Sequence, residues 1–214
     1  MKKIAVLNRI LNAVGQMVTV SILWTVCSLP LFTIGAASSS LYYCTVKAVR
    51  RESGNVLTDF FRVFKENFWQ ALPVTMIILI YETLIGFLVV QHFHSTGIVG
   101  IDSFIAICVG FAIPGIWFMV YVFPCISRFY FKGIRLFRFV LYISVKHLAS
   151  TLLIIGLFLV SGFLCLSNGV FLIIVPALYN FMVSFLLEPI FRDCSSNPDS
   201  YEYKLWYSDD RENL

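Results

Sequence analysis

The chain alternates between long apolar stretches and short segments that carry its charges. Residues 10–46, 103–127 and 148–187 contain no charged side chain, and residues 72–91 carry a single charge at Glu82. At about 1.5 Å per residue, roughly 20 helical residues span a hydrocarbon core of about 30 Å. Each stretch is therefore long enough to cross a membrane at least once.

The first stretch, residues 10–46, is too long for one straight crossing and is expected to fold back. Pro30 and Gly35 should supply the break, because proline cannot continue the helical hydrogen bonds and glycine permits a turn. The arm after the break, residues 36–50, is short and rich in small residues, which suits close helix packing. It either crosses the membrane completely or forms a re-entrant arm.

The last stretch, residues 148–187, is long enough for two crossings, which an Asn-Gly turn at residues 167–169 would separate. We therefore predict an all-α, polytopic helical membrane protein of about five to six membrane segments, arranged as three helical hairpins. Residues 1–192 are expected to form a single integral membrane domain, and residues 193–214 a short cytoplasmic tail.

The basic residues predict the orientation of these segments. All 16 Lys and Arg fall into four groups, and the apolar stretches between the groups contain none. Lys and Arg are retained in cytoplasmic loops during insertion, so all four groups are placed in the cytoplasm. Both termini and the links at residues 51–71 and 128–147 are then cytoplasmic, in a multi-pass protein of the plasma membrane.

Composition agrees with an integral membrane protein and argues against two other classes. Hydrophobic residues make up 59% of the chain and the mean hydropathy is +0.84, more than a soluble domain of this size readily buries. Topology explains the net charge of +4, so no nucleic-acid partner is expected. The six cysteines are scattered without a Cys-x-x-Cys pair, which argues against a disulfide framework.

Two cytoplasmic segments have the pattern of amphipathic helices with charged residues on one face. The apolar face of the first consists of Leu57, Phe60, Phe61, Phe64 and Phe68. The second has a stripe of basic residues, Arg128, Lys132, Arg135, Arg138 and Lys146. The first helix is expected on the membrane surface or against a partner. The basic stripe is expected either to contact anionic lipid at the cytoplasmic face or to dock a cytosolic protein.

Glu82 is the one ionisable residue near the middle of an apolar stretch. A carboxylate at that depth is costly, so we expect it to face the bundle interior, with Asn180 and Tyr179 as candidate partners. Two interpretations stay open: a hydrogen-bonded acid that fixes helix register, or a group used in transport or sensing. Glu188 lies near the predicted cytoplasmic interface, where water is expected to solvate it.

No pattern in the sequence points to catalysis. The nucleophile elbow, the phosphate-binding loop and the zinc-protease helix motif are absent. His92, His94 and Asp102 share one connection, but histidines two positions apart do not converge on a metal from a helix or a strand. We therefore expect no enzyme activity, no cofactor and no metal site.

Several segments resemble the YesL family of small bacterial membrane proteins, domain of unknown function 624. They are LPLFTIGA at residues 29–36, LYY at residues 41–43, Gly54, and DFFRVFKENF at residues 59–68. The family has no established activity, and the resemblance implies a bacterial cell membrane. Its motif matches Pro30, Gly35, Asp59, Phe61, Lys65 and Asn67. These residues have plausible structural roles in a break, a turn and an amphipathic helix.

Members of this family are commonly encoded beside carbohydrate ABC importers and glycan-utilisation genes. The resemblance therefore implies a non-enzymatic accessory protein in sugar uptake or sensing, in contact with membrane lipid and with carbohydrate ABC permease or ATPase subunits. The alternative, which comes from the residues themselves, is a small transporter or channel with Glu82 at its centre.

Overall fold

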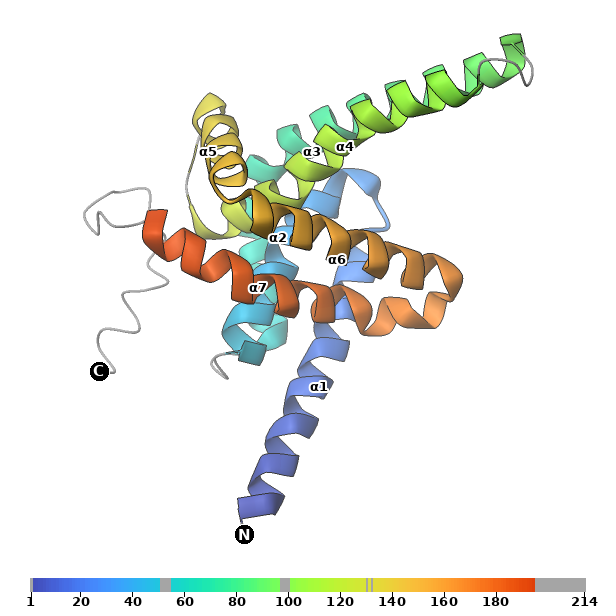
Figure 1. Ribbon diagram of the computed structural model, residues 1–214. Helices are drawn as coiled ribbons and strands as arrows, with labels where there is room; N and C mark the ends of the chain where they lie inside the picture. The colour runs from blue at the N-terminus through green and yellow to red at the C-terminus, as the bar shows by residue number, and fades with distance from the viewer. Residues whose placement is uncertain (1, 51–54, 97–100, 130, 132, 195–214) are drawn as a thin grey trace.

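The computed structural model describes residues 2–50, 55–96, 101–129, 131 and 133–194, and within these ranges its regular structure is helical (Figure 1). This confirms the predicted all-α class. The α-helices are α1 (Lys2–Cys27), α2 (Ile34–Cys44), α3 (Val56–Thr96), α4 (Ile101–Arg128), α5 (Ile134–Lys146), α6 (Leu148–Ser167) and α7 (Val175–Cys194). Helix α7 passes the predicted domain boundary at residue 192, and the rest of the predicted tail lies outside the described residues.

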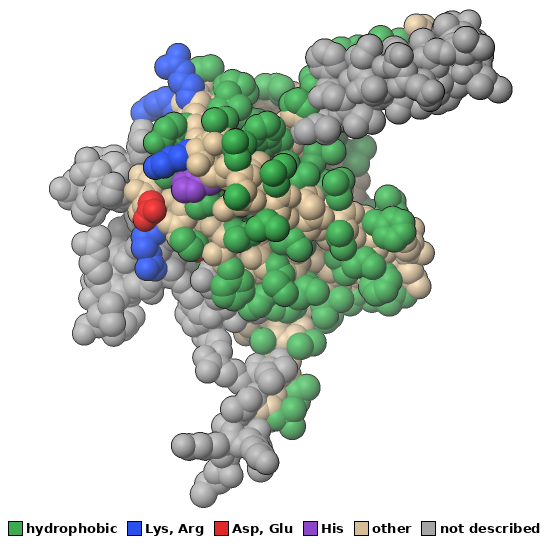
Figure 2. Space-filling view, in the orientation of Figure 1, with side chains coloured by type: hydrophobic (Ala, Val, Ile, Leu, Met, Phe, Trp, Pro, Cys, Tyr) green, Lys and Arg blue, Asp and Glu red, His purple; other side chains and the backbone are tan. Residues whose placement is uncertain are grey.

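Among the described residues, two helices are long and apolar enough to cross a membrane, namely Val56–Leu88 of α3 and the whole of α6. Only 17% and 11% of their most apolar portions are buried within the protein, so most of this apolar surface faces outward. Figure 2 shows this apolar surface on one face of the protein, where most of the side chains are hydrophobic. The charged side chains on that face gather near α5 and the end of α7. Such helices suggest a membrane protein.

Helix α2 is the centre of the fold and contacts α1, α3, α4 and α7. Its small residues let the neighbouring helices approach closely. The hydroxyls of Ser39 and Ser40 both donate to the carbonyl of Ala36, at 2.9 and 2.8 Å, which satisfies them in the interior. The buried residues of α2 are Gly35, Ala36, Ala37, Ser39, Ser40, Leu41, Tyr42 and Cys44.

The chain breaks between α1 and α2 as predicted, but Gly35 is not part of the turn. Pro30 precedes a short 3₁₀ turn (Leu31–Thr33), which Thr33 closes by donating its hydroxyl to the carbonyl of Pro30 at 2.6 Å. Gly35 lies in the first turn of α2, where a Cβ atom would overlap Thr75 Oγ1 and lie 2.6 Å from Phe123 Cε1. The glycine therefore serves the close approach of α2 to α3 and α4.

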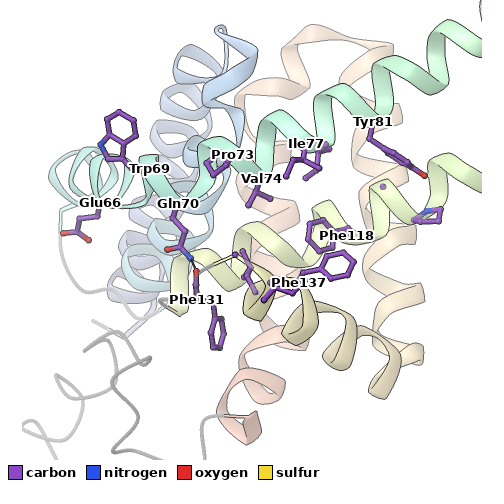
Figure 3. A pocket seen from close by; sticks show the side chains of 16 residues that line it. Glu66, Trp69, Gln70, Pro73, Val74, Ile77, Tyr81, Phe118, Phe131 and Phe137 are labelled. Atoms are coloured by element: carbon purple, nitrogen blue, oxygen red, sulfur yellow. Dashed lines mark hydrogen bonds between the residues drawn. The ribbon is translucent and has the colours of Figure 1, made fainter.

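The first predicted amphipathic helix and the apolar stretch after it are one continuous helix, α3. Asn55 caps its start, where Oδ1 accepts a hydrogen bond from the backbone N–H of Leu57 at 3.1 Å. Phe60 is fully buried in a cluster formed with α1 and α2, so much of the apolar face packs against protein instead of lying on the membrane surface. The helix continues through Pro73, where Figure 3 shows it changing direction.

The predicted basic stripe does not lie on one helix. Arg128 ends α4, and Gly133, at a φ of 54° that favours glycine, precedes α5. Arg135, Arg138 and Lys146 are exposed on α5, but Arg128 turns inward and is 3% exposed. The prediction is therefore wrong for Arg128, because the chain changes direction after it. The remaining member, Lys132, lies outside the described residues.

The predicted turn between the last two helices is confirmed. Helix α6 ends at Ser167, and Asn168 Oδ1 accepts a hydrogen bond from the backbone N–H of Val170 at 3.1 Å. A 3₁₀ turn (Gly169–Ile173) then leads into α7, which returns along α6 (Figure 1). This asparagine-based turn is local, which is why the sequence alone indicates it.

Candidate functional site

A buried ion pair joins α4 to α7. Arg128 Nη2 donates to Glu188 Oε1, and the two residues are 3% and 7% exposed. The expectation that water solvates Glu188 is wrong, because the residue lies on the face of α7 that also carries the buried Ser184 and Phe191. Ser184 and Phe191 lie four residues before and three residues after Glu188, and this spacing is the sequence signal that could have revealed the burial of Glu188.

Tyr42 of α2 completes this cluster. Its hydroxyl donates to Glu188 Oε1 at 2.9 Å, and the Arg128 guanidinium carbon lies 5.6 Å from the centre of its ring. Tyr42 is fully buried. Because moving a charge out of water costs several kcal/mol, the opposite charge and the tyrosine hydrogen bond are needed to offset that cost. Three helices that are distant in the sequence are thus fastened at one point.

The arrangement suits a structural role. Arg128 lies at the carboxyl end of α4, where the helix dipole favours a positive charge. Neither of the two cavities described below is lined by Tyr42, Arg128 or Glu188. A solute in either cavity would therefore not reach the ion pair, and the cluster can hold helices together without taking part in chemistry.

A second polar cluster fastens α3 to α2 and to the π-helix (Thr45–Arg50) that continues α2. Asp59 Oδ1 accepts from Arg62 Nη2 at 2.6 Å, and Asp59 Oδ2 lies 3.9 Å from Lys47 Nζ. Both cations also donate to the hydroxyl of Tyr43, at 3.2 and 3.4 Å. Asp59 is in the first turn of α3, where a carboxylate is favoured. This family-motif residue therefore has a structural role at the junction.

The remaining motif residues of α3 divide between two faces. Asn67 is buried, and its side-chain amide donates to Ser39 Oγ of α2 at 3.3 Å. Phe61 is 53% exposed and Lys65 is exposed as well. Side chains four residues apart are neighbours on a helix, so the exposed residues form one continuous row. This row, which we call the α3 ridge, consists of Leu57, Phe61, Lys65 and Trp69.

The structure does not bring Glu82 to its candidate partners. Glu82 lies on α3 against α4, where a Cβ atom on Gly115 would overlap its Oε1. Asn180 donates its side-chain amide to the carbonyl of Pro176 at 2.9 Å, within its own helix α7. The ring of Tyr179 packs on Phe158 of α6, with the ring centres 5.9 Å apart. Glu82 and the α7 pair therefore belong to different parts of the bundle.

Among the described residues, two cavities between the helices are large enough to hold a small molecule. The smaller, of about 310 Å³, is formed by α1, α2, α4, α6 and α7, and its lining includes Tyr179, Asn180 and the hydrogen-bonded pair of Trp24 and Ser38. The larger, of about 890 Å³, is a groove between α3, α4 and the start of α5 (Figure 3). The described residues contain no cluster of His, Cys, Asp or Glu that could hold a metal. The side chains of His92, His94 and Asp102 lie outside that description.

Residues 17–92 match a family model described as "Protein of unknown function, DUF624". The match supports the resemblance to domain of unknown function 624. It includes α2 and most of α3, with Tyr42, Asp59 and Asn67, but neither Arg128 nor Glu188. Comparisons with the curated proteins and with solved structures gave no match.

Proposed function

We propose that this chain is a non-enzymatic accessory protein of a membrane, and that it holds a partner protein against the α3 ridge. One observation carries the proposal: the motif residues of α3 point in two directions. Asp59 and Asn67 are buried and hold α3 against α2 and the segment that follows it, through Lys47 and Ser39. Phe61 and Lys65 are exposed. Packing within the chain accounts for the inward residues, and a partner would account for the outward ones.

We place the protein in the bacterial cell membrane with about five to six membrane segments. In this arrangement both termini, the link at residues 51–71 and the link at residues 128–147 are cytoplasmic. The exposed basic residues of α5 and the start of α3 support the orientation, since both belong to these links. The α3 ridge then begins at the cytoplasmic surface, where a membrane or cytosolic subunit can reach it.

The partner we propose is a permease or ATPase subunit of a carbohydrate ABC importer. The resemblance to the YesL family supports this choice. The chemistry of the ridge agrees with a protein partner, because two aromatic side chains, an aliphatic one and a single cation are typical of a helix that docks in a groove. A complementary groove would be apolar with an acidic rim.

Purification in mild detergent with quantitative mass spectrometry tests this proposal. We expect transporter subunits to copurify with the wild-type chain and to fall about tenfold or more with Phe61→Ala, the loss typical of an aromatic anchor. Phe163→Ala is the matched control, because this α6 phenylalanine is 71% exposed and lies far along the chain from the ridge. Equal recovery of the same subunits with both variants would refute docking at the ridge.

A small transporter or channel is the second candidate, favoured by the position of the Glu82 carboxylate between α3 and α4, where it lies against Gly115. If Glu82 is a structural acid, Glu82→Gln should leave the melting temperature in detergent unchanged, while Glu82→Leu should cost about 0.6 to 2 kcal/mol of helix association. Solute-dependent growth of cells that carry each variant gives the functional measurement. If Glu82→Gln abolishes growth without changing the melting temperature, the transporter is favoured, because the function would then require an ionisable side chain at this position.

A further inference from the structure

The groove between α3, α4 and α5 is explained neither by the buried ion pair nor by the α3 ridge. Its volume of about 890 Å³ lies near the upper end of the range of about 300–1,000 Å³ that is usual for small-molecule sites. Its walls are mainly apolar, and Figure 3 shows Ile77 and Tyr81 of α3 on one side and Phe118 and Phe137 on the other. The last two rings pack together, with centres 5.3 Å apart.

The groove runs from a polar region into an apolar one. Its α3 wall extends from Glu66, at the polar end, through Pro73 to Tyr81 in the uniformly apolar part of the helix. Ile77 is 68% exposed there. An occupant must therefore be soluble in the hydrocarbon region at one end and compatible with polar surroundings at the other.

Positive charge lies beside the groove on α5. Ile134 lines the groove, and the exposed Arg138 lies four residues later on the adjoining surface of the same helix. The groove also contains one carboxylate, that of Glu66, which belongs to the opposite wall on α3. An anionic group would therefore be favoured on the α5 side.

We propose that this groove binds an anionic phospholipid, with an acyl chain between α3, α4 and α5 and the phosphate held by Arg138. Guanidinium groups bind phosphate oxygens through charge-assisted hydrogen bonds, and basic pockets between membrane helices recognise anionic headgroups. A second copy of this chain fits less well, since a two-fold interface would bring the same arginines together from both subunits. Trp69 belongs to both the groove and the α3 ridge, but lipid binding is measured on the purified chain without a partner, so its outcome does not depend on docking at the ridge.

Native mass spectrometry of the purified full chain tests the site. The probes are phosphatidylglycerol and phosphatidylcholine with identical acyl chains, each added to the protein in a neutral detergent. We expect the wild-type chain to retain phosphatidylglycerol in preference to phosphatidylcholine. Arg138→Gln should lower the affinity for phosphatidylglycerol about fivefold, the contribution usual for one basic residue near an anionic lipid. Lys146→Gln removes the same charge from the far end of α5 and should leave the selectivity unchanged.

Filling the groove gives a second and separate measurement. Ile77→Trp should reduce retention of both lipids, whereas Leu153→Trp should reduce neither, since Leu153 is 60% exposed on α6 and does not line the groove. Melting temperatures in the same detergent show whether each variant is folded. Equal binding of the two lipids by the wild type, equal effects of Arg138→Gln and Lys146→Gln, or a dimer that Ile77→Trp dissociates would each overturn the proposal.

Discussion

Replacing Arg128 with methionine is expected to lower the free energy of unfolding by about 3–5 kcal/mol, because it leaves the Glu188 carboxylate buried without its opposite charge. Glu188 is 7% exposed, so water cannot take the place of the guanidinium without opening the contact between α4 and α7. The measurement is reversible unfolding in mild detergent, followed by circular dichroism or by titration with a denaturing detergent.

The matched control removes the whole cluster at once. The triple variant Tyr42→Phe, Arg128→Met and Glu188→Met leaves no charge and no tyrosine hydroxyl in the interior. Replacing a buried ion pair by well-packed apolar residues is often neutral or stabilising by about 1–4 kcal/mol, so the triple variant should recover most of the loss. If the triple variant is as unstable as Arg128→Met, an uncompensated charge is not the cause and the interpretation fails.

Gly35→Ala is expected to lower the free energy of unfolding by about 1–3 kcal/mol, the usual cost of adding volume to a packed core. The new methyl group would overlap Thr75 Oγ1 and lie 2.6 Å from Phe123 Cε1, so α2 would have to move away from α3 and α4. Because α2 is the centre of the fold, such a movement disturbs several helix contacts together.

Gly156→Ala is the control for this second prediction. Gly156 lies within α6, and a Cβ atom there meets nothing within 4 Å. Alanine is the better helix former by about 1 kcal/mol, so Gly156→Ala should be neutral or stabilising. Both variants are compared by melting in the same detergent. Equal stabilities for Gly35→Ala and Gly156→Ala would mean that helix packing at Gly35 is looser than the structure indicates.

The helical class and the positions of the main turns could be predicted because they depend on local information. Length and hydropathy indicated α6 and α7, and the asparagine at residue 168 marked the turn between them. The continuity of α3 could not be read in the same way. Pro73 and the change from amphipathic to uniformly apolar sequence resemble a boundary, but packing against α2 and α4 carries the helix through them.

The candidate site was harder to predict, because its polar residues come from separate helices. Arg128 and Glu188 are 60 positions apart in the sequence, and each alone has the pattern of a solvated residue at a membrane boundary. Gly35 was predicted to turn the chain, whereas its function depends on Thr75 and Phe123, which no local pattern connects to it. Asp59 and Asn67 matched the family motif, but only the structure separates them from the exposed Phe61 and Lys65.

Photo-crosslinking in native membranes tests most directly whether the α3 ridge holds a partner protein. A photoreactive amino acid is placed at residue 61 on the ridge, or at residue 163 on the exposed surface of α6. We predict a crosslinked transporter subunit from residue 61, identified by mass spectrometry, and only lipid adducts from residue 163. Lipid adducts alone from residue 61, or the same protein adducts from both positions, would contradict a docking role for the ridge.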